Sequence, residues 1–157
     1  EFVSDFLQVA ADEAMHFALL QRMLRSLGSH YGALPAHDGL WDTAHETRGD
    51  VAARLAVVPM ALEARGLDVT PMMIERLGTA GDARGVSILQ RILDDEIRHV
   101  RAGTNHFVAV CERRGEAPED SWKNLIGRYF PGAIKGPFND SARESAGLSR
   151  SYYATLA

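Results

Sequence analysis

Two stretches of the chain share one pattern of chemically active side chains, Asp-Glu-x-x-His. The first runs from Asp12 to His16 and the second from Asp95 to His99. The numbers of glutamates and histidines in the chain predict only about 0.4 chance Glu-x-x-His matches, so two with the same preceding aspartate are significant. On a helix, residues three apart lie on one face, so the carboxylate and imidazole of each pair can bind one metal ion. Two such helices facing each other would make two metal positions bridged by carboxylates.

The four ligand candidates of these motifs lie on the apolar stripes of their helices and should point toward the core. They are Glu13, His16, Glu96 and His99. Burying an unpaired carboxylate costs several kcal/mol, and a divalent metal ion compensates that cost. The alternative is a hydrogen-bonded Glu–His cluster between the helices without metal.

The aspartate of each motif lies one position, or about 100°, away from the ligand face. Asp12 and Asp95 could each reach the histidine of the other helix and fix its tautomer, as carboxylates behind metal-bound histidines commonly do. The alternative is that both are solvated surface charges.

A further carboxylate, Glu63, follows a stripe of small residues on the next predicted helix. It precedes Glu96 by 33 residues. This separation is typical of two antiparallel helices that place residues at the same level of a bundle. Glu63 is therefore a candidate metal ligand, and a surface charge near a helix end is the alternative.

Apolar periodicity and turn residues predict an all-α chain without strands, in which long antiparallel helices form a bundle. The expected elements are a helix over 2–27, a loop over 28–43, a helix over 44–65, a short helix from residue 70 to about 78, a long helix over 82–114, and a helix over 118–129. Pro59 should kink the second helix, Gly66 should end it, and Thr70 with Pro71 should begin the next. An irregular C-terminal arm follows, with at most one helix.

Composition is typical of one ordinary domain. The 157 residues are 46% hydrophobic and 24% charged, with a net charge of −4. We expect a single helical domain over 1–157, with bundle helices and a crossover loop over 1–130 and the arm over 131–157.

The charge gives no reason to expect a nucleic-acid partner, and no apolar run is long enough for a membrane span. The protein is expected to be cytoplasmic.

The order Glu-x-x-His, long crossover, Glu, Glu-x-x-His resembles the di-metal carboxylate proteins of the ferritin-like superfamily. That superfamily includes ferritins, rubrerythrins, ribonucleotide reductase radical subunits, bacterial monooxygenases and a tRNA hydroxylase. Three stretches more closely resemble an uncharacterised bacterial ferritin-like family without a settled activity: residues 34–41 (LPAHDGLW), 61–71 (ALEARGLDVTP) and 135–139 (KGPFN). The resemblance covers nearly the whole chain and implies a ferritin-like four-helix bundle. It also implies the metal ligands Glu13, His16, Glu63, Glu96 and His99.

The superfamily pattern contains one more glutamate, on a helix before the first Glu-x-x-His. By the spacing seen here, it would lie about twenty residues before Glu1. Asp5 cannot replace it, because it lies two turns, or about 12 Å, from Glu13 along the helix axis. We therefore expect a trimmed chain that lacks the first ligand helix and binds metal incompletely. Its open bundle groove should be covered by a second copy, by the chain's own tail or by the missing N-terminal segment.

These observations predict a di-iron or iron–manganese carboxylate enzyme that uses dioxygen to oxidise or hydroxylate a small organic substrate. Glu13 and Glu96 would bridge the two metals, and His16 and His99 would give one imidazole to each. Two alternatives remain: a ferroxidase or iron-storage protein, and a metal-free scaffold whose purpose is association.

Several residues outside the two Asp-Glu-x-x-His motifs give weaker functional signals. His106 follows His99 by seven residues on the same face, so it could line a channel to the metals or be an ordinary core histidine. Three histidines flank the long loop, where surface or capping roles are expected and metal ligation is the alternative: His30, His37 and His45. The arm could close one end of the bundle as a lid or simply pack against it. The arm residues concerned are 135–139, Arg143, Tyr152 and Tyr153.

Overall fold

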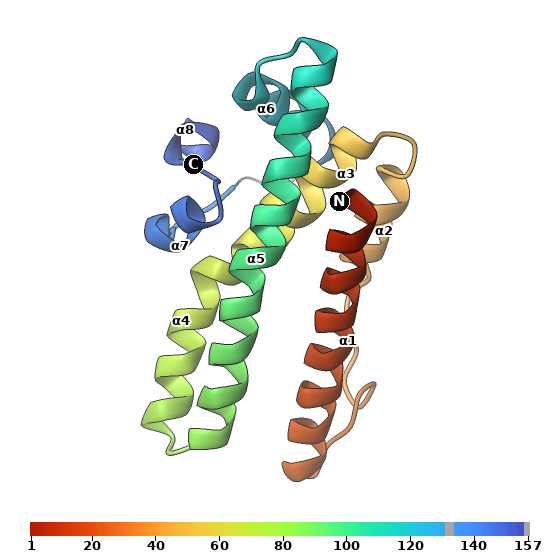
Figure 1. The fold of residues 1–157 in the computed structure, drawn as a ribbon. Coiled ribbons are helices and arrows are strands. Elements are labelled where there is room, and N and C mark those ends of the chain that lie inside the picture. Colours follow the sequence, from red (N-terminus) through yellow and green to blue (C-terminus); the bar gives the residue numbers. More distant parts are fainter. Residues whose placement is uncertain (131–133, 156–157) are drawn as a thin grey trace.

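The computed structural model describes residues 1–130 and 134–155, and every regular element in these stretches is a helix. The predicted all-α bundle is confirmed. The elements are α1 (Phe2–Ser26), α2 (Gly39–Glu46), α3 (Val51–Val57), the π-helix η1 (Val58–Glu63), α4 (Ala64–Thr79), α5 (Ala83–Arg114), α6 (Pro118–Tyr129), α7 (Asp140–Ser145) and α8 (Arg150–Tyr153). The long α5 runs antiparallel to both α1 and α4, and α6, α7 and α8 gather around its C-terminal half (Figure 1).

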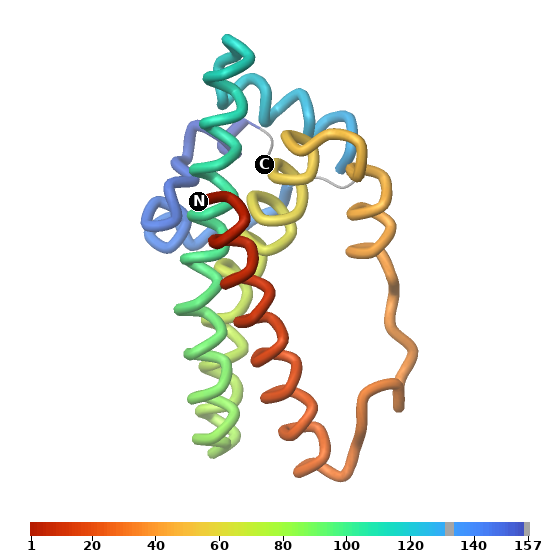
Figure 2. The backbone as a smooth tube through the Cα atoms, turned by 45° about the vertical axis from the view of Figure 1, so that its right-hand side comes forward, coloured from red at the N-terminus to blue at the C-terminus, as the bar shows by residue number. Residues whose placement is uncertain are grey.

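Helix α1 matches the predicted range, but its packing differs from the prediction. Its two buried residues are Asp12 and His16, whereas Phe17 and Leu20 are 48% and 39% exposed. The helix packs chiefly against α5, and the chain then returns through residues 27–38 along the outer edge of the molecule (Figure 2). Most of the apolar stripe predicted to face a core is therefore open, and the buried contact of α1 is polar.

The predicted helix over 44–65 has the wrong bounds. The regular run begins at Val51, where the side chain of Asp50 accepts a hydrogen bond from Ala52 N. It passes through Gly66 without a break and ends at Thr79, so α3, η1 and α4 form one continuous helical path. A glycine in a helix interior costs only about 1 kcal/mol, which packing against α5 offsets.

A π-helix lies at Pro59, the position of the predicted kink, and proline and π-helical turns are both usual causes of helix kinks. Proline has no N–H and its ring disturbs the preceding turn, so the usual hydrogen-bond ladder cannot continue there. The residues from Val58 to Glu63 adopt the wider π pattern, which often occurs at functional sites. The ring of Pro59 lies directly against Gly103 of α5. Glu63 is the last residue of this turn, so the π-helix sets its direction.

The prediction that Thr70 and Pro71 begin a helix is wrong, because Pro71 lies inside α4. Pro71 cannot donate to the carbonyl of Leu67, four residues earlier. Asn139, from the C-terminal arm, donates its side-chain Nδ2 to that carbonyl over 3.2 Å. The defect caused by Pro71 is therefore repaired from a segment distant in sequence.

The loop predicted over 28–43 is wrong in its second half, where α2 begins at Gly39. The carbonyl of Ala44, near the end of α2, accepts a hydrogen bond from Arg54, and Thr47 accepts another from the same side chain. Carbonyls at a helix end have no partner within the helix, so Arg54 stabilises this short element. Helix α2 packs against η1 and thereby approaches Glu63.

Helices α5 and α6 agree with the prediction. The side chain of Asp82 accepts a hydrogen bond from Gly85 N over 2.8 Å at the start of α5. Gly115 ends the helix in the left-handed conformation, with φ 69°, as glycine commonly does at helix ends. Both signals are local, which explains why the sequence predicts them well.

The C-terminal arm contains two short helices, α7 and α8, where at most one was expected; residues 131–133 and 156–157 lie outside the described parts. Arg143 is buried and binds both carboxylate oxygens of Asp68 on α4, at 2.9 and 2.7 Å. Its guanidinium also lies over the rings of Phe138 and Tyr153. The arm therefore packs as part of the core, which favours the packing interpretation over a lid.

The hydrophobic core lies between α3, η1, α5, α6 and the arm. Its largest fully buried side chains include Trp122, Phe107, Leu55, Met60 and Leu148. Within residues 1–130 and 134–155, no helix combines the length and apolarity needed to cross a bilayer. The core thus fixes α5 and η1, two of the elements that carry the candidate site.

Candidate metal centre

The two Asp-Glu-x-x-His motifs meet across the interface of α1 and α5 in a reciprocal arrangement. Asp12 Oδ2 lies 3.2 Å from His99 Nε2, and Asp95 Oδ2 lies 3.1 Å from His16 Nε2. The centroids of the two imidazole rings are 5.7 Å apart. Each aspartate thus holds the histidine of the opposite helix, in the geometry expected of carboxylates behind metal-bound histidines.

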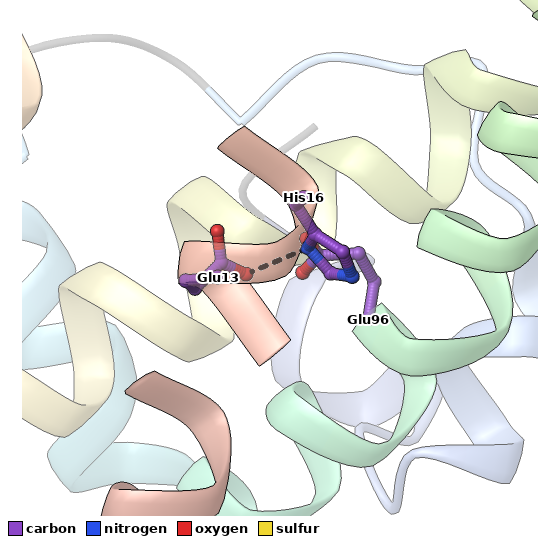
Figure 3. Close-up of side chains that lie close together, drawn as sticks. All are labelled: Glu13, His16 and Glu96. Atoms are coloured by element: carbon purple, nitrogen blue, oxygen red, sulfur yellow. Dashed lines mark hydrogen bonds and ion pairs between the residues drawn. The ribbon is translucent and has the colours of Figure 1, made fainter. Parts of the chain in front are cut away.

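Because both Nε2 atoms face aspartates, both Nδ1 atoms face the glutamates. His16 Nδ1 lies 3.2 Å from Glu13 Oε1, and His99 Nδ1 lies 3.2 Å from the same oxygen. Figure 3 shows Glu13 and His16 from α1 beside Glu96 from α5. Glu13 is a partial exception to the predicted burial, since its side chain is 47% exposed.

These side chains form two groups that could each hold a metal ion. Glu13, His16 and Glu96 can place one oxygen or nitrogen each within 4.8 Å of one another. Glu63, Glu96 and His99 form a second group by the same measure. The structure therefore brings all five predicted ligand candidates together, and Glu96 belongs to both groups.

Two buried polar atoms of this cluster, Glu96 Oε2 and His99 Nδ1, make no hydrogen bond of acceptable geometry among the residues that the structure describes, although Glu13 Oε1 lies 3.2 Å from His99 Nδ1. They lie 3.8 Å apart. Leaving a buried polar atom unpaired costs about 1–3 kcal/mol, so a completed hydrogen-bonded cluster would not leave two side by side. A metal ion between them would use both atoms, so the residues present fit such a group.

Burial also changes the protonation of the carboxyl groups. Burial raises the pKa of Glu63 to about 7, against the opposing charge of His99. Burial, together with the charges of Glu63 and Glu13, raises the pKa of Glu96 to about 8. The close approach of His99 lowers the pKa of Glu13. Metal ligands must be deprotonated, so a metal ion bound here would displace protons from Glu63 and Glu96.

The pKa of His99 responds to competing effects. Burial alone lowers it, but the nearby carboxylates of Glu13 and Asp12 outweigh burial and raise it to about 9. In the metal-free protein His99 is thus positively charged and compensates part of the acidic cluster. A divalent metal ion would supply that positive charge instead and leave the imidazole neutral.

Two arginines that the sequence analysis did not single out complete the cluster. Arg91 Nε lies 2.6 Å from Asp95 Oδ2, and Arg98 contacts the other oxygen of Asp95. Burial opposes ionisation of Asp95, but hydrogen bonds from Arg91, His16 and Arg98 lower its pKa to about 2. The spacings of four and three residues along one helix are the signal that could have identified them.

The remaining histidines lie elsewhere. His106 Nε2 is 2.7 Å from Asp5 Oδ2, and its ring packs near Phe2 and Phe6 at the N-terminal end of α1. These contacts favour a packed, hydrogen-bonded histidine over a residue that lines a channel. The three histidines around the long loop are exposed and belong to neither metal-binding group: His30, His37 and His45.

Substitution of Asp12 by asparagine is expected to weaken metal binding by about 10- to 100-fold, because the neutral amide orients His99 less firmly and leaves its imidazole a weaker base. The measurement is a competitive titration of metal-free protein with Fe²⁺ or Mn²⁺. The matched control is Asp94→Asn, since Asp94 is exposed on the same helix as His99. Equal affinities for the two variants would contradict the assigned role of Asp12.

The metal-free protein is expected to lose several kcal/mol of stability as pH rises from about 5 to 8. Glu96 and Glu63 have pKa values above those of the unfolded chain, so the folded state keeps protons that the unfolded state releases over this range. Their contribution is complete below the unfolded pKa and disappears as pH rises through the folded pKa. Urea denaturation in the presence of a chelator measures it, and Glu96→Gln should flatten the profile. A stability that rises over this range would contradict the assigned burial.

Comparison with known proteins gives a family but no activity. Residues 1–154 match the family described as "Protein of unknown function (DUF455)". An uncharacterised protein of Haemophilus influenzae is 41% identical over 149 residues, which cover 95% of this chain and 52% of that protein. The chain thus spans about half the length of this relative. No solved structure matches the present chain. The resemblance to an uncharacterised bacterial family is confirmed.

Proposed function

The chain belongs to the DUF455 family of proteins of unknown function, and from its candidate metal centre we propose that it is a di-metal carboxylate oxidase or oxygenase. In this proposal two metal ions, iron in the first place and manganese as the alternative, act with dioxygen on a small organic substrate. The ferritin-like resemblance of the ligand order supports the proposal.

The strongest support for this proposal is the reciprocal pairing of Asp12 with His99 and of Asp95 with His16. It turns the Nδ1 atom of both histidines toward the same glutamates. A cluster that served only packing would not need two matched, oriented imidazoles on opposite helices. The unpaired atoms of Glu96 and His99 add to this support.

The donor set fits iron or manganese. Three carboxylates and two imidazoles give a mixed oxygen and nitrogen environment, which suits these metals. When bound, such a pair of ions supplies the electrons and the Lewis acidity that dioxygen chemistry requires.

The protein's own residues have distinct roles in this scheme. Glu96 belongs to both groups and would bridge the metals. Glu13 belongs to the first group, and because its Oε1 also lies 3.2 Å from His99 Nδ1 it would be the second bridge, while Glu63 would bind one metal alone. Asp12 and Asp95 hold the imidazoles. Arg91 and Arg98 keep Asp95 ionised, so that it remains a hydrogen-bond acceptor for His16.

Anaerobic loading of the full-length protein with Fe²⁺, followed by exposure to dioxygen, tests the proposal. We expect oxygen uptake that stops at about two oxidised irons per chain and resumes only with a reductant and a substrate. Continued oxidation of excess Fe²⁺, with large particles in light scattering, would instead indicate a ferroxidase or storage protein. If the protein took up no metal and consumed no oxygen, the remaining alternative would be a metal-free scaffold whose purpose is association.

A further inference from the structure

A hollow of about 420 Å³ opens directly onto the glutamates of the candidate metal centre. One of its walls carries Glu13, Glu63 and Glu96, the three carboxylates of the site. A volume of this size lies within the range of small-molecule sites in proteins. The hollow has room for a molecule of about ten non-hydrogen atoms beside the metals.

The rest of the lining is apolar. Leu40 of α2, Val58 and Leu62 of η1, and Gly66 of α4 complete it. None of these lining residues has a cationic side chain or a side-chain hydrogen-bond donor. An anionic group on a bound molecule would therefore lose its hydration against this part of the lining without gaining a partner, which is costly.

Gly66 leaves one side of the hollow open. A Cβ atom built on Gly66 meets no other atom within 4 Å, although the residue lies inside the helical run of α4. A side chain at this position would therefore extend into the space that Gly66 lines. Glycine costs stability inside a helix, so its presence here keeps space free beside the three carboxylates.

We propose that this hollow is the substrate chamber and that it selects a largely apolar small organic molecule without an anionic group. The proposal rests on the proposed function, since it places the substrate of that reaction against the metal-binding glutamates. Leu40, Val58 and Leu62 contact the apolar body of the substrate, and Gly66 provides its space. Selectivity against anions comes from the absence of a cationic or hydrogen-bond-donating side chain among Leu40, Val58, Leu62 and Gly66.

Binding of simple probes to the metal-free protein tests the chamber independently of catalysis. Benzyl alcohol and toluene are the neutral probes, and benzoate is the charged analogue of similar size. The measurement is the titration of methyl NMR signals of Leu40, Val58 and Leu62. We expect saturable shifts with at least one neutral probe and binding of benzoate at least 10-fold weaker.

The variant Gly66→Phe should fill the chamber and weaken binding of the neutral probe at least 10-fold. It should still bind as many metal ions as the unchanged protein. Gly127→Phe is the matched control, because Gly127 also lies in a helix and a Cβ there meets no other atom within 4 Å. This control should bind probes and metal normally.

The outcomes separate this inference from the proposed function. Normal metal binding with no neutral-probe binding, or with equal binding of benzoate, overturns the chamber and leaves the metal centre intact. Probe binding that survives Gly66→Phe also overturns it. Loss of metal from Gly66→Phe but not from Gly127→Phe would show that the chamber and the metal site are not separate, which contradicts the proposal as stated. Failure of the unchanged protein to bind any metal would instead overturn the proposed function.

Discussion

Replacement of Glu96 by alanine is expected to abolish binding of both metal ions. Glu96 is the one side chain shared by the two potential ligand groups, so its loss leaves each with two members. Two remaining ligands hold a divalent ion far more weakly, and we expect affinity to fall by at least about 100-fold at each position. Metal analysis after equilibrium dialysis against Fe²⁺ or Mn²⁺ measures this result.

Two further variants make this prediction specific. His16→Ala removes a ligand from one group only and should cost one metal equivalent. His37→Ala should leave metal content unchanged, since His37 is exposed and its Nδ1 accepts a hydrogen bond from Gly39 N. Equal metal loss from all three variants would move the site toward the loop and contradict the assignment.

The second large effect concerns the contact between α5 and the π-helix. Gly103→Ala should destabilise the protein by about 2–3 kcal/mol, because cores with no spare room respond to an added methyl group by strain. A Cβ on Gly103 would lie 2.4 Å from two carbons of the Pro59 ring, which cannot rotate away. The π-helix and Glu63 would have to shift, so metal affinity at the Glu63 position should also fall. Urea denaturation and metal titration measure the two effects.

Gly127→Ala is the control for this prediction. Gly127 lies in α6, and an added Cβ there meets no atom within 4 Å. Its replacement should stabilise the protein by up to about 1 kcal/mol through helix propensity alone. If Gly103→Ala behaved in the same way, the close packing of Pro59 on α5 would be refuted.

The elements that the sequence predicts well are those whose signals are local. The start of α5 at Asp82 and its end at Gly115 depend on neighbouring residues, and both agree with the structure. The interpretation of Pro71 as a helix start failed for the opposite reason. The chain continues as a helix because Asn139, more than sixty residues later, supplies the missing hydrogen bond. Sequence periodicity carries no information about such a contact.

In the candidate metal centre, too, the sequence predicts the features that depend on local spacing. The three-residue spacing within each Glu-x-x-His motif predicts that its two side chains share one face of the helix. The structure brings Glu13 and His16 toward Glu96, as this spacing predicts. The crossed contacts of Asp12 and Asp95 with the opposite histidines also have the predicted geometry. Their role in metal binding stays a prediction.

Two features of the site could not be predicted from the pattern. The direction of Glu63 depends on the π-helix, which arises from Pro59 and its packing against Gly103. The exposure of Glu13 depends on how little of the protein packs against α1, whereas the pattern alone predicts an apolar face toward a core. Both are consequences of packing between distant segments.

Anomalous X-ray diffraction at the iron edge, on crystals loaded with Fe²⁺ without oxygen, tests the central claim most directly. For crystals of the full-length protein the account predicts two peaks about 3.5–4 Å apart, on the Nδ1 side of the His16 and His99 rings, with Glu96 bound to both. The peak beside Glu63 should be the stronger, since Glu63 gives that position a carboxylate of its own. A single peak, peaks only beside the histidines of the loop, or no peak at the α1–α5 interface would contradict a di-metal centre.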